Sequence, residues 1–192
     1  MSGMTLQHSP ISDEELQHAR DTGGVELVDG HLVEKPVSKE SSRIAATISY
    51  LLRHHVQQTG GAEVYGADLG YQCFPDEPAR YRKPDVSVLR TARLAPLDPD
   101  PGLMPIPPDL AVKVLAPTDF ACDVAKRVDE YLRNGFPLVW VVEPNTRTVI
   151  IHRADGSVTK LRANDDITGD SALPDFRCKV AEFFDQPPVK PK

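Results

Sequence analysis

Apolar and polar residues alternate with two different periods along this chain, and the change of period predicts an α/β arrangement. Over 38–58 the apolar residues recur every three or four positions, which is the spacing of an amphipathic helix. A second helical pattern covers 118–134. Between and after these stretches, short runs rich in β-branched residues indicate strands. This order is typical of an α/β domain with a mixed β-sheet flanked by helices.

The clearest strand signal is a hairpin. Two runs of alternating apolar and polar residues, 25–28 and 31–34, flank the dipeptide Asp29-Gly30. An Asp-Gly pair readily takes the positive φ angles of a two-residue turn between antiparallel strands. We therefore expect a β-hairpin here, with the acidic residue Glu26 on its first strand.

The remaining strand candidates are short and bounded by turn residues. The run 110–115 is strongly apolar, which predicts a buried central strand, and 138–142 resumes the sheet after the second helix. Further strand candidates are 63–65, 69–74, 85–89, 148–153 and 158–161.

Length and composition indicate one domain. A chain of 192 residues with 40% apolar content can bury one substantial core. Ser12 and Glu15 have the spacing of a capping box, which predicts a short helix within the N-terminal segment 1–23. We place the domain at 24–184 and expect a loose tail over 185–192.

Charge and cysteine content restrict the environment and the partners. No stretch approaches the roughly 18 consecutive apolar residues that a membrane span requires. The three cysteines form no CxxC pair and are too few for a disulfide framework, so we expect a reduced, cytoplasmic protein. Asp and Glu outnumber Lys and Arg by 28 to 22, which disfavours a large non-specific nucleic-acid surface and leaves a local basic patch open.

Asp85 is the leading candidate for a chemical role. It follows Pro84 at the start of a predicted strand, where a side chain can project from the end of a sheet. A carboxylate there could hold a hard divalent cation, which activates water and stabilises the charge that develops on a phosphate during cleavage. The ordinary alternative is an aspartate that begins a strand and accepts a hydrogen bond from a nearby backbone N–H.

The second predicted helix carries a charged pair. Asp123 and Lys126 are three residues apart, so both lie on one face and can point together toward the sheet. The ordinary alternative is an exposed ion pair worth only about 0.2–0.5 kcal/mol. Thr118 or Asp119 can cap this helix.

Five segments that follow one another with consistent spacing over 24–184 resemble the Uma2 family, which is DUF820-like, of the PD-(D/E)xK nuclease superfamily. No single segment is specific, but five in order are hard to obtain by accident. The segments are Glu-Leu-Val-Asp-Gly at 26–30, Lys-Pro-Asp-Val-Ser-Val at 83–88, Pro-Asp-Leu-Ala-Val-Lys-Val-Leu-Ala-Pro at 108–117, Asp-Val-Ala-Lys at 123–126 with Tyr131 and Gly135, and Val-Trp-Val-Val-Glu-Pro at 139–144.

The resemblance implies a restriction-endonuclease-like core and a metal-dependent endonuclease, a hydrolase that cuts phosphodiester bonds. Acidic side chains would hold Mg²⁺ or Mn²⁺, and a lysine would assist the attacking water. The implied partner is nucleic acid, with DNA as the first candidate. Related nuclease folds are often dimers, which leaves a homodimer open.

The same resemblance assigns site residues. It implies Asp85 and Glu26 as metal ligands and Lys126 as the catalytic cation; a solvated strand glutamate is the alternative for Glu26. Lys113 stands where the family carries a glutamate that completes the metal site. An ammonium cannot ligate Mg²⁺ and repels the ion from a neighbouring aspartate. The family's first helix usually begins with a histidine, at the position of Ser41.

We therefore predict that Asp85, Lys113, Glu26 and Lys126 converge in one pocket. We also expect the Lys113 ammonium to pair with Asp85, because an unpaired buried ammonium costs several kcal/mol. The alternative is that Lys113 extends past the sheet edge to solvent. Two functions remain: a metal-dependent endonuclease with a degenerate active site, or a catalytically inactive nuclease-fold module for binding or oligomerisation.

Overall fold

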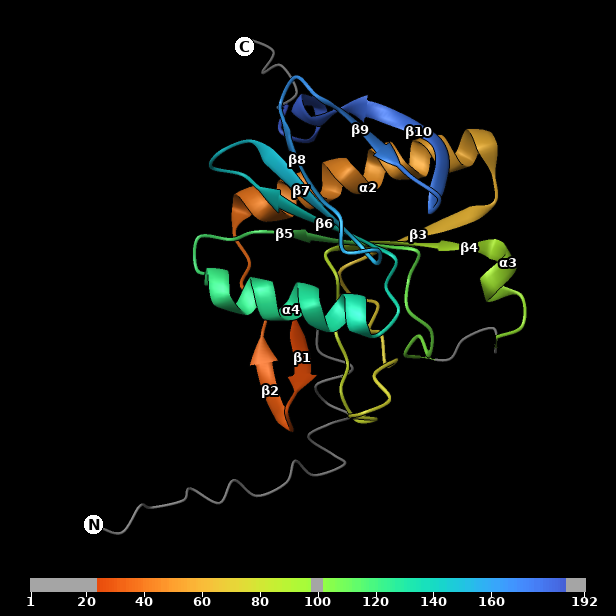
Figure 1. The fold of residues 1–192 in the computed structure, drawn as a ribbon, viewed down its shortest axis with the longest axis vertical. Helices are drawn as coiled ribbons and strands as arrows, with labels where there is room; N and C mark the ends of the chain where they lie inside the picture. Colours follow the sequence, from red (N-terminus) through yellow and green to blue (C-terminus); the bar gives the residue numbers. More distant parts are fainter. Residues whose placement is uncertain (1–23, 98–101, 186–192) are drawn as a thin grey trace, which may run out of the picture.

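The computed structural model describes residues 24–97 and 102–185, and its centre is a six-stranded sheet with the order β3-β4-β5-β6-β7-β8 (Figure 1). Within this sheet β5 and β6 are parallel and the other neighbours are antiparallel. The mixed sheet confirms the predicted fold class. Its strands are β3 (Ala62–Gly66), β4 (Val86–Arg90), β5 (Leu110–Val114), β6 (Leu138–Glu143), β7 (Thr148–Arg153) and β8 (Val158–Arg162).

Two long helices cover opposite faces of the sheet (Figure 1). They are α2 (Lys39–Thr59) and α4 (Ala121–Arg133), within a few residues of the predicted 38–58 and 118–134, and a short α3 (Thr91–Leu94) follows β4. Ser38 and Ser41 form a capping box at the start of α2. Ser41 therefore has a structural role at the position where the resemblance places a histidine.

The alternation of side chains along β5 divides the interior into two layers. Leu110, Val112 and Val114 pack in one apolar cluster with residues of α2. Ala111 packs in a second cluster with residues of α4. Because side chains alternate along a strand, Lys113 lies on the same face as Ala111, toward α4.

The predicted hairpin is confirmed. β1 (Val25–Val28) and β2 (His31–Glu34) pair antiparallel through Asp29 and Gly30, whose φ angles are 50° and 73°. Both values are positive, as a two-residue turn of this type requires. Leu27 and Tyr81 exchange backbone hydrogen bonds of 3.3 and 3.1 Å, which attach the hairpin to the rest of the fold beside α4 (Figure 1).

The C-terminal part adds a second small sheet above α2 (Figure 1). It consists of β9 (Asp166–Gly169) and β10 (Leu173–Lys179), followed by the 3-10 helix η1 (Val180–Phe183). Phe176 of β10 and Phe183 of η1 lie next to the fully buried Trp140, with ring centroids 6.2 and 6.0 Å from it. This sheet therefore closes the core on the side of α2.

One predicted strand is wrong. The segment 69–74 forms no continuous strand; Tyr71 makes isolated bridges to Arg82 and Met104 instead. The backbone groups of Tyr71 thus pair with two separate loop segments, so 69–74 does not join a continuous strand. The helix predicted within 1–23 and the tail residues 186–192 lie outside the described residues. None of the helices in the described ranges is long and apolar enough to cross a membrane.

Candidate active site

Asp85 lies immediately before β4, where this strand meets β5. Its backbone N–H donates to the carbonyl oxygen of Val112 at 2.9 Å. Its carboxylate oxygen Oδ2 accepts a hydrogen bond of 2.7 Å from the backbone N–H of Val114. Asp85 is thus bonded to a backbone N–H at the start of a strand, but the donor comes from β5 and not from the local turn that the ordinary interpretation assumes.

Two buried lysines lie near the same carboxylate, although the Lys113 ammonium makes no hydrogen bond. Lys35 Nζ lies 2.9 Å from Asp85 Oδ1, and Lys113 Nζ lies 3.8 Å from Asp85 Oδ2. Lys113 has a closer partner in Asp119, at 3.0 Å. The side chains of Lys35 and Lys113 are 2% and 5% exposed, so the alternative of a solvent-directed Lys113 is wrong. We call Lys35, Asp85, Lys113 and Asp119 the lysine–aspartate cluster.

The cluster contains two residues that the sequence did not indicate. The expected pairing of Lys113 with Asp85 is present, but at 3.8 Å it is the longer of the two ion pairs that Lys113 makes. Asp119 does not cap α4, which begins after Phe120 without a side-chain cap. It accepts instead from the backbone N–H of Ala116 at 2.7 Å, which turns its carboxylate toward Lys113.

Glu26 is buried in a different set of contacts. Its Oε2 accepts from Arg82 at 3.1 Å and from Arg127 at 2.9 Å, and its Oε1 accepts from the backbone N–H of Lys83 at 2.8 Å. The side chain is fully buried, so the solvated alternative is wrong. Its side-chain partners are arginines, whereas those of Asp85 are lysines.

Lys126 corresponds to the ordinary interpretation of an exposed pair. Its side chain is 80% exposed and lies 4.0 Å from Asp123. The neighbouring Arg127 is 13% exposed and reaches Glu26. One step along a helix turns a side chain by about 100°, which separates the two residues. The sequence could have identified Arg127 as the inward-facing cation, because it shares its helical face with the apolar residues Val124 and Tyr131.

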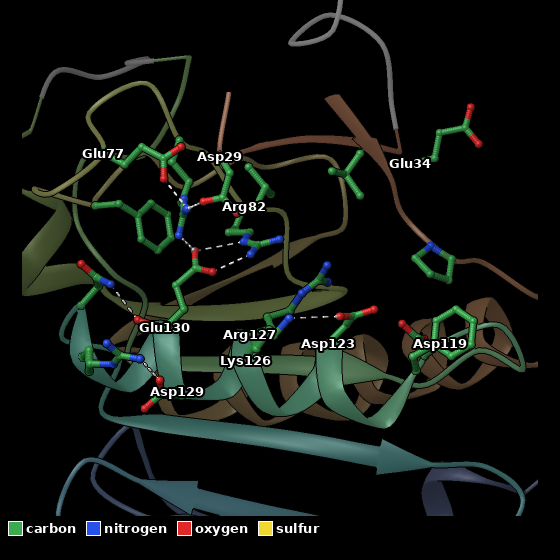
Figure 2. Close-up of a pocket in the computed structure, with 18 of the residues that line it drawn as sticks. Asp29, Glu34, Glu77, Arg82, Asp119, Asp123, Lys126, Arg127, Asp129 and Glu130 are labelled. Carbon is green, nitrogen blue, oxygen red and sulfur yellow. Dashed lines mark hydrogen bonds and ion pairs between the residues drawn. The ribbon is translucent and has the colours of Figure 1, made fainter. Parts of the chain in front are cut away.

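A groove of about 730 Å³ lies between the hairpin, the segment 74–82 and α4 (Figure 2). Lys126 and Arg127 line it, as does Asp119 of the lysine–aspartate cluster. Eight acidic and five basic side chains contribute to its lining. The acidic ones are Asp29, Glu34, Asp76, Glu77, Asp119, Asp123, Asp129 and Glu130, and the basic ones are Arg80, Arg82, Lys126, Arg127 and Arg133.

The most buried cations of the groove are already paired within the protein. Arg82 bonds to Glu130 at 2.5 Å, and Arg80 bonds to the same carboxylate at 3.2 Å (Figure 2). Arg80 also contacts Asp29 and Glu77. Burial by itself lowers the pKa of Arg82, but the hydrogen bond with Glu130 and the charge of Glu26 outweigh it and raise the pKa. The guanidinium therefore stays charged, with its charge neutralised inside the groove.

The side chains do not fit a divalent metal. Within 24–97 and 102–185, no group of three His, Cys, Asp or Glu side chains stands where it could hold an ion. Mg²⁺ takes oxygen ligands in near-octahedral geometry. Both carboxylate oxygens of Asp85 and both of Glu26 already accept from ammonium, guanidinium or backbone N–H groups. Within the described residues, Asp85 and Glu26 therefore lack the third carboxylate, histidine or cysteine that would complete such a site.

Comparisons with known proteins agree on family and fold. Residues 13–181 match the model of the Uma2 family, which is described as "Putative restriction endonuclease". A solved structure from Anabaena variabilis ATCC 29413, described as "a putative nuclease belonging to DUF820", is similar with a TM-score of 0.73. The match has 20% sequence identity and covers 83% of this chain and 89% of that one. No curated protein matches the chain.

Proposed function

Because this chain belongs to the Uma2 family of restriction-endonuclease-like proteins, we propose that it is a nuclease-fold interaction module that does not cut phosphodiester bonds through a divalent metal. One observation carries the proposal: both oxygens of Asp85 are engaged, Oδ1 by Lys35 and Oδ2 by the Val114 N–H, with the Lys113 ammonium beside it. The active site of the family is thus degenerate in this chain.

Electrostatics supports this proposal. Two unit charges 4 Å apart interact by about 4 kcal/mol at the effective dielectric constant of a protein site. A divalent ion at Asp85 would meet repulsion of this order or more from each nearby ammonium. Since Lys35 and Lys113 already balance Asp85 and Asp119, the cluster has no excess negative charge with which to attract the ion.

The partner proposed here is a protein surface, because the groove is poorly suited to a phosphate backbone. Acidic side chains outnumber basic ones in its lining, and nucleic-acid affinity depends on unpaired lysines and arginines. On and after β2, Leu32, Val33 and Val37 are 41%, 38% and 66% exposed, and Val33 also lines the groove. Exposed apolar side chains favour contact with a protein, and the candidate is a second copy of the chain. Light scattering measures the molar mass in solution and so tests this proposal. A monomeric mass at high protein concentration would contradict the proposed homodimer.

A metal-dependent DNA endonuclease is the second candidate. It is supported by the family match and by the nearness of Asp85 and Lys113, which puts the two family site positions at one end of the sheet. In this candidate Mg²⁺ or Mn²⁺ would supply the activated water. The two candidates make opposite predictions in one assay.

The assay is nicking of supercoiled plasmid and cleavage of single-stranded DNA with Mg²⁺ or Mn²⁺. We expect the chain and its Asp85→Asn variant to show the same background, since no metal acts at Asp85. Circular dichroism establishes that the variant is folded. Metal-dependent nicking that disappears in Asp85→Asn would establish the endonuclease and overturn the proposal.

A further inference from the structure

Lys35 is a buried cation that the family resemblance does not place in the site. It lies between β2 and α2, and its backbone N–H donates to Gly24 at 2.8 Å, which fixes the chain at the base of the hairpin. Its side chain is 2% exposed and ends 2.9 Å from Asp85 Oδ1. The position of Lys35 is thus determined by the fold, and its ammonium has little freedom to leave the carboxylate.

We infer that Lys35 and Lys113 together take the place of the divalent cation, and that Lys35 by itself weakens metal binding at Asp85. The inference rests on the proposed function and deepens it. It assigns to Lys35 a role that neither the family match nor the motif pattern gives. Asp85 then belongs to a latent divalent-metal site that is closed by two ammonium groups rather than one.

The charges of the cluster support this division of roles. Lys35 and Lys113 supply two positive charges to the two carboxylates of Asp85 and Asp119, which equals the charge of one divalent cation. Each ammonium also has a position of its own: Lys35 lies on Oδ1, and Lys113 lies between Oδ2 and Asp119. Removing Lys113 would therefore leave Oδ1 engaged.

The test replaces the lysines singly and together. Lys113→Glu provides the missing carboxylate but keeps Lys35, whereas Lys35→Met/Lys113→Glu provides it and removes the second ammonium at similar side-chain length. Lys126→Glu is the matched control, because it makes the same charge change on the exposed rim of the groove. Binding of Mn²⁺ is measured by electron paramagnetic resonance and binding of Mg²⁺ by calorimetry.

We expect no binding by the parent chain or by Lys126→Glu, weak binding by Lys113→Glu, and binding at least tenfold tighter by the double variant, roughly the factor that removal of one adjacent charge supports. Adding Asp85→Asn to the double variant should abolish binding. Equal affinity of Lys113→Glu and the double variant, or no binding by a folded double variant, would overturn the role of Lys35.

Two further outcomes keep the test decisive. If circular dichroism shows that the double variant is unfolded, Lys35→Gln/Lys113→Gln replaces it; both ammoniums are then neutral amides, and Mn²⁺ should bind more tightly than to Lys113→Gln alone. Equal affinity of these two variants would overturn the inference. Binding of Mn²⁺ at Asp85 in the parent chain is a different result, because it would contradict the proposed function itself.

Discussion

At the scale of single residues, the site depends on which of two adjacent cations in α4 faces inward. Lys126 is 80% exposed, whereas Arg127 is 13% exposed and bonds to the buried Glu26. The motif pattern pointed to Lys126, but the spacing of the apolar residues along the helix places Arg127 on the buried face. A buried carboxylate with two guanidinium partners is costly to disturb, because removing one partner leaves charge without compensation.

This contrast predicts unequal effects of two neighbouring substitutions. Arg127→Ala should lower the free energy of unfolding by on the order of 3 kcal/mol, because it leaves Glu26 with fewer partners in a buried position. Lys126→Ala should change it by less than about 0.5 kcal/mol, as is usual at exposed positions. Urea unfolding of both variants measures the difference. Equal destabilisation by the two would show that Arg127 does not support Glu26.

At the scale of elements, the hairpin was fully predictable, because its turn is encoded by two adjacent residues. Gly30 has a φ of 73°, and Asp29 has a φ of 50°. Helices α2 and α4 were predictable for a similar reason, since their apolar periodicity is local. The segment 69–74 was not, because its backbone pairs with Arg82 and Met104, partners that no local pattern identifies.

The turn can be tested with two glycines that both have room for a Cβ but differ in backbone angle. A Cβ at Gly30 or at Gly66 would meet no atom within 4 Å, but only Gly30 has a positive φ. Gly30→Ala should therefore cost about 1 kcal/mol of unfolding free energy from backbone strain. Gly66→Ala should be nearly neutral by comparison. A chemical denaturation series in which both variants unfold at the same midpoint would contradict the assigned turn.

At the scale of the whole molecule, family and fold could be read from the order of the motifs, but the state of the site could not. The sequence identified Lys113 as a departure from the family, because it stands where the family motif has a glutamate. Lys35 and Asp119 were not identified, because each meets the cluster only through the fold: Lys35 enters from the base of the hairpin and Asp119 from the loop before α4. Lys35 and Asp85 lie far apart in the sequence, so no local periodicity could predict that they form an ion pair.

The most direct test of the central claim is the thermal unfolding of the parent chain with Mg²⁺, with Mn²⁺ and with a chelator. A divalent metal that binds the folded chain, added at about a hundred times its dissociation constant, would increase the free energy of unfolding by about 2.7 kcal/mol. For a chain of this size that corresponds to a rise in Tm of roughly 5–10 °C. Because Lys35 and Lys113 already neutralise Asp85 and Asp119, we predict the same Tm in all three conditions at matched ionic strength. A rise of several degrees that is specific to the divalent metal and absent in Asp85→Asn would contradict the account.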